Sequence, residues 1–348
     1  MMNFSQYEFS TSMKTVLVTG GAGYIGSHFV ALLAERGVEY VVLDDLSRGT
    51  RQFVPPGRLI VGNVGDTQTV VEICHKYNVD VAVHFAAYAY VEESVADPAL
   101  YYENNVVNGV RFLNALRQAA VSSVVFSSSC ATYGIPNATG KISETTEQSP
   151  INPYGFTKLA FERLLCDYDI AYGIRSICLR YFNASGASMK RDLYERHQPE
   201  THFIPRAVAA ALQGEAIRLN GSDYATRDGT CERDYVHVDD LATAHLSAVN
   251  LLREGQRSDK INLGIGRGYT LLEVVAAIKA TTGLELNVEF APRRPGDPPA
   301  LVADPSKAAK ILAWSPQYTQ IEAIVATVVA AARRQRVAND GKADILVT

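Results

Sequence analysis

The sequence predicts an α/β fold, a doubly wound parallel sheet with a smaller C-terminal lobe, from three observations. Short apolar runs alternate with helical patterns from residue 14 to about residue 181, which is typical of a parallel sheet with helices on both faces. A glycine-rich turn joins the first of these runs to the first helical pattern. With 348 residues, the chain is also long enough to add a lobe to one large sheet.

The first half contains six apolar segments with the length of buried strands. Each is followed by a segment long enough to cross over the sheet, so consecutive strands are expected to run parallel. Their ranges are residues 15–19, 39–43, 59–62, 79–85, 124–128 and 176–181. Ligands of such sheets bind beyond the carboxyl ends of the strands, and the informative residues cluster there.

Two helical segments of this half, residues 100–119 and 154–172, carry apolar side chains on more than one face. A helix on the outside of a sheet needs only one apolar face, so a second one indicates another buried surface. We therefore expect a homodimer formed through these two helices. The alternative is a pair of core helices whose faces are all covered within one chain.

The second half has a looser pattern. Residues 183–205 are rich in Gly, Ser, Pro and charged side chains and are predicted to form a long functional loop. Strands are expected at residues 217–219, 233–238 and 261–263, and helices at residues 205–213, 239–252, 271–282, 306–313 and 321–334. This half is expected to cover the ligand site, with some pieces returning to the large sheet.

The first functional motif is the turn Gly20-x-x-Gly23-x-x-Gly26, which follows an apolar strand and precedes a helical segment. The first glycine permits a tight turn, the second lets the backbone approach a pyrophosphate, and the third allows close packing of helix on strand. The helix N-terminus adds free N–H groups and a partial positive charge. The motif therefore predicts a dinucleotide site of the Rossmann type.

Asp44 follows the second predicted strand, about 20 residues after the glycine turn. A carboxylate at this place accepts a hydrogen bond from a ribose 2′-hydroxyl, which favours NAD. Arg48, four residues later, keeps NADP as an alternative cofactor, because a guanidinium can pair with a 2′-phosphate.

A second motif, Tyr154-x-x-x-Lys158, places a phenol and an ammonium on one face of a helix. A tyrosine with a pKa of about 10 is a poor base at neutral pH, and one positive charge about 5 Å away lowers that pKa by about 2 units. The nicotinamide of NAD⁺ would add a second positive charge. Because a strand ending in Ser127-Ser128-Ser129 precedes this helix, the pair is predicted to perform general acid/base catalysis.

The composition argues against several classes of protein. The formal net charge is −4 and no basic block stands out, which argues against a nucleic-acid surface, and no apolar run of 18 residues predicts a membrane span. The seven histidines show no metal-ligand spacing, so no metal is expected. Five scattered cysteines indicate reduced thiols and a cytoplasmic protein, and residues 1–13 read as a flexible tail rather than a signal peptide.

Many short stretches, taken in order, resemble the extended short-chain dehydrogenase/reductase superfamily and, within it, the UDP-glucose (UDP-galactose) 4-epimerase family. The resemblance runs from about Val16 to about Trp314, nearly the whole chain. It is carried by VTGGAGYIGSH (18–28), HFAA (84–87), YYENNVVN (101–108), SSSCATYG (127–134), PYG (153–155), LRYFN (179–183), DGT (228–230), RDYVHV (233–238) and APRRPGD (291–297).

The resemblance implies an NAD-dependent isomerase that interconverts UDP-glucose and UDP-galactose through a transient 4-keto sugar. It implies that Tyr154 is the base, that Ser129 hydrogen-bonds the sugar 4-oxygen, and that Lys158 holds the nicotinamide ribose and lowers the pKa of the tyrosine. The implied cofactor contacts are Gly20, Gly23, Tyr24, Ile25, Gly26, Asp44, Asn63, Phe85, Ala86, Ala87, Asn104, Ser127, Tyr154, Lys158 and Tyr181. The implied substrate contacts are Ser129, Asn183, His202, Arg233, Arg294, Asp297 and Leu301.

The same resemblance divides the chain into an NAD-binding Rossmann domain and a UDP-sugar-binding lobe. The expected bounds are residues 14–185 for the first, with pieces of 233–266 returning to its sheet, and residues 186–348 for the second.

Four positions depart from the family's pattern. Asn63 stands where the family usually has an aspartate near the adenine, and Ala89 where some members place a lysine near the sugar. His202 replaces an asparagine beside the diphosphate, and Leu301 replaces a tyrosine that bears on sugar size. These changes put the range of sugars in question rather than the type of reaction.

Three alternatives stay open. A UDP-xylose/UDP-arabinose 4-epimerase is also resembled at residues 130–134 and 229–231. A nucleotide-sugar 4,6-dehydratase or decarboxylase is another rival; dehydratases need an acid and a base where this chain has Cys130 and Ala131. A non-catalytic NAD-sensing regulator would have no reason to keep Ser129, Tyr154 and Lys158 together.

Overall fold

The computed structural model describes residues 14–136, 140–294 and 297–343, so the expected tail at residues 1–13 lies outside the described part. A seven-stranded sheet in the order β11-β6-β5-β4-β1-β2-β3 forms the centre, and every neighbouring pair in it runs parallel. Its strands are β1 (Thr15–Thr19), β2 (Tyr40–Asp44), β3 (Leu59–Val61), β4 (Val79–His84), β5 (Ser123–Ser129), β6 (Arg175–Tyr181) and β11 (Asp259–Leu263). The α/β fold with a doubly wound parallel sheet is confirmed.

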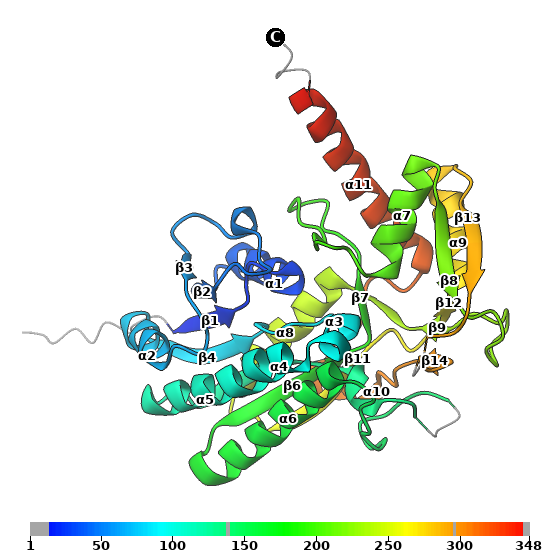
Figure 1. Cartoon of the computed structure of the whole chain (residues 1–348). Coiled ribbons are helices and arrows are strands. Elements are labelled where there is room, and N and C mark those ends of the chain that lie inside the picture. The colour runs from blue at the N-terminus through cyan, green and yellow to red at the C-terminus, as the bar shows by residue number, and fades with distance from the viewer. Residues whose placement is uncertain (1–13, 137–139, 295–296, 344–348) are drawn as a thin grey trace, which may run out of the picture.

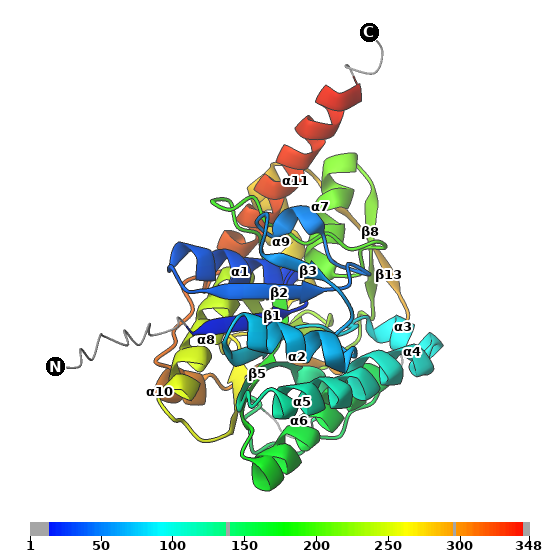
Figure 2. The same cartoon turned by 90° about the vertical axis from the view of Figure 1, so that its left-hand side faces the viewer.

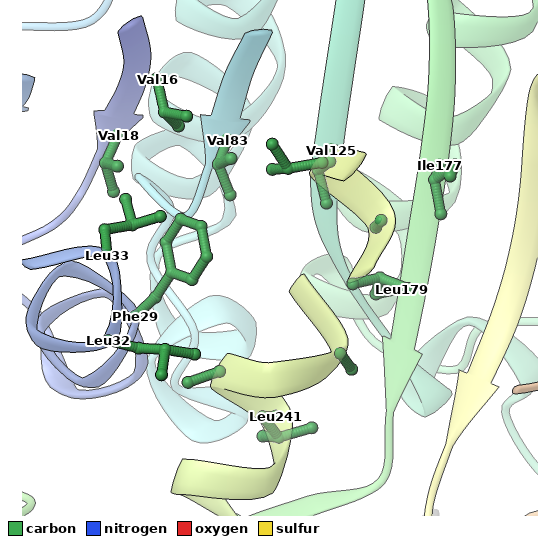
Figure 3. Packing of buried hydrophobic residues seen from close by; sticks show 14 of the residues in the cluster. Val16, Val18, Phe29, Leu32, Leu33, Val83, Val125, Ile177, Leu179 and Leu241 are labelled. Carbon is green, nitrogen blue, oxygen red and sulfur yellow. The ribbon is translucent and has the colours of Figure 1, made fainter. Parts of the chain in front are cut away.

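Helices cover both faces of this sheet (Figures 1 and 2). One face packs against α1 (Tyr24–Glu35), α8 (Val238–Arg253) and α10 (Ser306–Leu312); the other packs against α2 (Thr67–Lys76), α5 (Asn108–Gln118) and α6 (Pro153–Tyr172). Val16 and Val18 of β1 lie with Phe29 of α1 in the first core, shown in Figure 3, whereas Leu17 belongs to the second. Because side chains alternate along a strand, a run of apolar residues fills both cores.

The predicted helix at residues 100–119 is interrupted in the structure. It begins earlier, as α4 (Pro98–Tyr102), where the Asp97 side chain accepts a hydrogen bond from the backbone of Leu100. A π-helical turn, η2 (Glu103–Val107), then joins α4 to α5. Such turns are rare and span a single turn, too short to be recognised from sequence periodicity.

The C-terminal lobe has a hydrophobic core of its own. Its elements are α7 (Phe203–Gln213), β8 (Ala216–Asn220), α9 (Leu271–Thr282), β13 (Asn287–Ala291) and α11 (Ile321–Ala343). Strands β8 and β13 pair in parallel, and α7, α9 and α11 pack together. In Figures 1 and 2, α11 extends away from the rest of the chain.

The predicted strand at residues 233–238 is two strands in different sheets. β9 (Glu232–Arg233) pairs with β12 (Tyr269–Thr270) and β14 (Ala300–Leu301), whereas β10 (Tyr235–His237) pairs with β7 (Asn183–Ser185). Asp234 separates them because its buried carboxylate accepts hydrogen bonds from the backbone of Ile265, Gly266 and Ala303. Burial raises the pKa of Asp234 to about 6 despite those bonds.

The predicted loop at residues 183–205 is also wrong at both ends. Its first three residues form β7, and its last three belong to α7, which starts at Phe203. Strands of two or three residues carry no periodicity, so β7, β12 and β14 depend on partners distant in the sequence. The remaining short elements are η1 (Arg51–Phe53), α3 (Val91–Ala96) and η3 (Cys130–Tyr133).

Candidate active site

The end of β5 contacts three α6 residues that are spaced four apart. Lys158 donates from Nζ to the backbone oxygen of Ser127 at 2.8 Å, and Ser128 donates from Oγ to Glu162 at 2.6 Å. Tyr154 interacts with Ser129 through a side-chain hydrogen bond. We call Ser127, Ser128, Ser129, Tyr154, Lys158 and Glu162 the serine clasp. Residues four apart share one helix face, so the clasp fixes the register of α6 against the sheet.

The start of α6 is determined locally. Asn152 accepts a hydrogen bond from the backbone of Gly155 at 2.8 Å, and Pro153 occupies the first helical position. A Cβ atom on Gly155 would lie 2.5 Å from the backbone oxygen of Ala131, so only glycine lets α6 approach η3 this closely. Tyr154 is thereby held next to the residue that follows Ser129 and Cys130.

In the predicted acid/base pair, Lys158 is buried and Tyr154 is partly buried. Burial raises the pKa of Tyr154 to about 12, and the hydrogen bond from Ser129 opposes this rise. Burial lowers the pKa of Lys158 to about 7, against the charge of Glu162, which raises it. The Lys158 Nζ lies 5.8 Å from the Tyr154 ring centroid. In the chain alone, burial therefore dominates the pKa of the phenol, and a pKa lowered toward neutrality stays a prediction for the cofactor complex.

Glu162 and Arg180 form a buried ion pair beneath the clasp, with side chains 0% and 1% exposed. Arg180 donates from Nε and Nη2 to the two carboxylate oxygens at 2.8 and 2.6 Å, and from Nη1 to the Tyr133 hydroxyl at 2.7 Å. Burial disfavours the charge of Glu162, but Arg180 holds its pKa below the usual value. The sequence patterns did not predict this pair, although Glu162 stands four residues after Lys158 on the same helix face.

The glycine turn has the shape that a dinucleotide site requires. A Cβ atom on Gly20, whose φ is +72°, would lie 2.5 Å from the backbone nitrogen of Ala86, and one on Gly26 would lie 2.3 Å from the Gly20 oxygen. Gly23 precedes α1 and offers no side-chain cap, which leaves the first N–H groups of the helix open. The backbones of Phe85 and Ala86 donate to Thr19 at 2.9 and 3.1 Å, so this segment lies directly against the turn.

The contacts of Asp44 and Arg48 bear on whether the site prefers NAD or NADP. The nearly buried Asp44 carboxylate accepts from the backbone of Ala22 and Leu46, both at 2.9 Å, and burial raises its pKa. Arg48 is held by Glu93 at 2.6 and 2.7 Å, and its guanidinium lies 4.7 and 4.6 Å from the ring centroids of Tyr88 and Tyr90. Because Arg48 is already paired, the site favours NAD over NADP.

The other predicted cofactor residues range from buried to exposed and lie on several different elements. Tyr181 of β6 is buried, with its hydroxyl 3.2 Å from Nε2 of His245, and Tyr24 donates to the Gly186 oxygen at 2.6 Å. Asn104 donates to Asn105, whose side chain contacts Tyr88 and Thr157 and so joins η2 to α6. Asn63 is exposed beyond β3, where it accepts from the backbone of Gly65. Ile25 and Ala87 are partly buried at α1 and after β4.

Two of the predicted substrate arginines are paired with carboxylates. Arg233 is largely buried on β9 and donates from Nη2 to Asp297. Arg294 lies 3.2 Å from Glu92 of α3, with side chains 48% and 70% exposed. A bound diphosphate would have to take these guanidinium groups from their carboxylate partners.

The remaining predicted substrate residues lie near these arginines or near η3. Leu301 pairs with Arg233 across β14 and β9, and it is buried in a small apolar cluster with Cys130 and Phe182. Asn183, partly buried, begins β7. His202 precedes α7, and its Nδ1 contacts Glu195. Ala89 is exposed.

The five cysteines are free, and all but Cys166 are buried. Among the described residues, no helix combines the length and hydropathy that a membrane crossing demands.

Comparison with known proteins places this chain in a family. Residues 16–264 match the model of the NAD dependent epimerase/dehydratase family. A UDP-glucose 4-epimerase of Rhizobium meliloti (strain 1021) is 47% identical over 306 residues, which cover 88% of this chain and 93% of that protein.

Two solved structures share the fold over nearly their full length. A UDP-glucose 4-epimerase from Brucella ovis in complex with NAD has a TM-score of 0.88 and 48% identity, covering 91% of this chain and 98% of that one. A UDP-glucose 4-epimerase from Stenotrophomonas maltophila with bound NAD and formylated UDP-arabinopyranose has a TM-score of 0.89 and 32% identity, covering 93% and 99%. The chain therefore belongs to the NAD dependent epimerase/dehydratase family, the family of these UDP-glucose 4-epimerases.

Proposed function

We propose that this chain is an NAD-dependent 4-epimerase, an isomerase that interconverts UDP-glucose and UDP-galactose. The observation that carries the proposal is the serine clasp, which holds Ser129, Tyr154 and Lys158 together at the carboxyl end of the sheet. The 47% identical relative is named a UDP-glucose 4-epimerase. The site and the relationship thus support the same reaction.

The residues of the site fit NAD. Gly20 and Gly26 leave no room for a Cβ atom at the turn, and the Asp44 carboxylate keeps lone pairs for ribose hydroxyls. Lys158 projects from α6 toward the ends of β5 and the phenol, where a nicotinamide ribose would be held. When bound, NAD⁺ supplies the redox chemistry at C4 of the sugar without net consumption.

Proton transfer at C4 is the work of the clasp. Tyr154 accepts the proton of the sugar 4-hydroxyl and returns it after the sugar has turned, while Ser129 hydrogen-bonds the same oxygen. Lys158 stabilises the phenolate by its charge. Ser129 and Lys158 are buried and Tyr154 is partly buried, which limits the access of water to these groups.

The diphosphate and the uridine are held at a distance from this chemistry. Arg233, Arg294 and Asn183 would bind the diphosphate, and Asp297 the uridine ribose; His202 and Leu301 would lie beside the diphosphate and the sugar. A guanidinium suits phosphate oxygens because it donates two parallel hydrogen bonds. Binding energy placed there leaves the sugar free to rotate through the 4-keto form.

The direct test is product analysis. The purified chain is incubated with UDP-glucose, UDP-galactose, UDP-xylose and UDP-N-acetylglucosamine, without added nucleotide, and the products are resolved. Conversion of UDP-glucose to UDP-galactose with bound NAD released on denaturation is the expected result. A stoichiometric need for added cofactor, or an elimination product, would overturn the proposal.

A UDP-xylose/UDP-arabinose 4-epimerase is the second candidate, because a relative of this fold was solved with formylated UDP-arabinopyranose. The sugar panel separates the two by comparing kcat/KM. A dehydratase is not supported: Cys130, whose pKa burial raises to about 12, and Ala131 offer neither an acid nor a base. A regulator that only senses NAD would turn over none of the sugars.

We further propose that the chain is a cytoplasmic homodimer. Large apolar side chains are exposed along α4, η2 and α6, namely Leu100, Tyr102, Val107, Phe156 and Ile170. Figures 1 and 2 show α5 and α6 side by side on the outside of the sheet. Light scattering should give twice the chain mass, and Phe156→Glu should give monomers; a monomeric parent would contradict the proposal. The five free cysteines support the cytoplasm.

A further inference from the structure

Residues 186–202 connect β7 to α7 and lie against the start of α1. The Tyr24 hydroxyl donates to the Gly186 oxygen at 2.6 Å. The ring centroid of His197 lies 6.3 Å from that of Tyr24 and 5.3 Å from that of Tyr90. This segment therefore covers the turn where the nucleotide phosphates are expected.

Four side chains of this segment converge: Glu195, His197, Glu200 and His202. Their donor atoms all lie within 4.8 Å of one another. Both imidazoles present Nδ1, and both carboxylates present Oε1. Nδ1 of His197 lies 3.0 and 3.6 Å from the oxygens of Glu195 and Glu200, and Nδ1 of His202 lies 3.7 Å from that of Glu200.

These separations suit one tetrahedral cation. Zn²⁺ binds imidazole nitrogen and carboxylate oxygen at about 2.0–2.2 Å, which puts the donors of a tetrahedron about 3.3–3.6 Å apart. These three distances bracket this range. The fourth contact, between Nδ1 of His202 and Glu195, is a direct hydrogen bond that the two side chains would give up to bind the metal. Two carboxylates and two neutral imidazoles also balance a charge of +2, so the bound cluster would carry no net charge.

Two further observations concern the atoms that would bind the metal. Oε1 of Glu200 accepts from the backbone of Thr201 and His202 at 2.8 and 2.9 Å, which fixes the carboxylate. Nδ1 of His197 is shielded from solvent and, among the described residues, makes no hydrogen bond of acceptable geometry. A buried nitrogen left in this state is available to a metal.

We propose that Glu195, His197, Glu200 and His202 form a Zn²⁺ site that fixes the conformation of residues 195–202 beside the nucleotide-binding turn. The spacing Glu195-x-His197-x-x-Glu200-x-His202 joins two acids and two histidines, a pattern the sequence analysis did not recognise when it expected no metal. The rival is a cluster of two imidazolium and two carboxylate ions, which uses the same side chains but binds no metal. His202 is also the residue proposed to lie beside the diphosphate, so the metal site would border the substrate, but metal binding does not depend on which sugar is turned over.

Metal binding itself is the test. The full chain with its bound nucleotide is treated with a chelator, dialysed and titrated with ZnCl₂ by calorimetry. One Zn²⁺ per chain is expected, with affinity reduced at least about 10–100-fold in His197→Ala and in Glu195→Gln. His75→Ala, which changes an exposed histidine of α2, should bind like the parent. Absent stoichiometric binding, or equal affinity in His197→Ala and the parent, would overturn the site.

A second set of measurements distinguishes loss of the metal site from misfolding of a variant. Co²⁺ replacing Zn²⁺ should give the visible absorption of a tetrahedral nitrogen and oxygen site. An intense thiolate charge-transfer band would place the metal on a cysteine and overturn the assignment. Zn²⁺ should also raise the thermal midpoint of the parent but not of His197→Gln, each compared with its own metal-free form. An equal Zn²⁺-induced rise in both proteins would contradict the site.

Discussion

The ion pair beneath the serine clasp and the pair made by Arg294, one of the two predicted substrate arginines, satisfy their charges in opposite ways. Arg180 and Glu162 are 1% and 0% exposed and form a two-point contact within a wider hydrogen-bond network. Arg294 and Glu92 are 48% and 70% exposed and meet through a single contact between α3 and the segment after β13.

This difference reflects two tasks. Groups that move a proton must hold their positions in every turnover, so they belong to rigid and fully paired elements. An exposed group that is proposed to bind a diphosphate, such as Arg294, must release its carboxylate partner when the diphosphate arrives, so a weak and solvated pair suits it better. If this comparison is right, substitutions in the two regions should differ in kind as well as in size.

The largest effect is expected from Tyr154→Phe in the clasp. The substitution removes the proton acceptor but keeps the ring volume, so turnover should fall by about 10²–10⁴-fold or more. Binding of UDP, measured by calorimetry, should stay within about twofold of the parent, because the diphosphate contacts lie elsewhere. Turnover within a few-fold of the parent would remove Tyr154 from the mechanism.

The next largest effect is on folding. Arg180→Met leaves the Glu162 carboxylate buried without its partner, which should lower the free energy of unfolding by about 3–5 kcal/mol. Arg163→Met is the matched control, because Arg163 pairs with Asp167 on the same helix with 77% and 49% exposure. That change should cost no more than about 0.5 kcal/mol in urea unfolding. Similar losses in both variants would show that burial does not distinguish the pairs.

Lys158→Met tests the cost of burying a charge in the clasp. The folded pKa of Lys158 is about 7, below its ordinary 10.5, so the unfolded chain binds more protons between these values and stability rises with pH there. Below pH 7 Lys158 is protonated in both the folded and the unfolded chain, so the full free-energy cost of burying its charge is present. The variant should therefore be more stable than the parent at neutral pH, by on the order of 1–3 kcal/mol, and lose this advantage toward about pH 10.

Urea unfolding of both proteins across this pH range checks the sign. An advantage that stays constant with pH would mean that Lys158 is not the titrating group. Turnover of the variant should also fall, because the phenolate would lose its neighbouring charge.

Substitutions in the exposed pair of Arg294 and Glu92 should change UDP binding but not kcat. Arg294→Gln should weaken UDP binding by about 10-fold, because a hydrogen bond to a charged group contributes about 1.5–3 kcal/mol. Glu92→Gln should tighten it by about two- to fivefold, because a competing partner worth about 0.2–1 kcal/mol is removed. Arg293→Gln, which breaks the exposed pair with Asp223, is the control and should change little. Loss of kcat in Glu92→Gln would argue against a role confined to binding.

The smallest effect concerns the sugar. Leu301 is 9% exposed beside Cys130, and Leu301→Tyr adds volume to this small cluster. If the cluster borders the sugar, the variant should lose several-fold in kcat/KM on an N-acetylhexosamine substrate and less on UDP-glucose, UDP-galactose and UDP-xylose. Equal losses on all four sugars would show that the residue acts through packing only.

The sequence by itself determined the features whose cause is local. The strands of the large sheet, the glycine turn and the Tyr154-x-x-x-Lys158 face follow from patterns within one element or one turn. The carboxylate at Asp44 is also readable, because the distance from the turn is set by one βαβ unit. The parallel sheet that these features predict is the one that the structure contains.

Only the tertiary structure decided which distant groups meet. Arg180 of β6 pairs with Glu162 of α6, and Arg48 pairs with Glu93, which lies 45 residues away in the sequence. The burial that raises the pKa of Tyr154 and lowers that of Lys158 comes from helices and strands that pack around them. Free energies of burial and charge pairing depend on distances that no local pattern encodes, so the sequence named the candidate reacting groups and only the fold determined their burial and their charged partners.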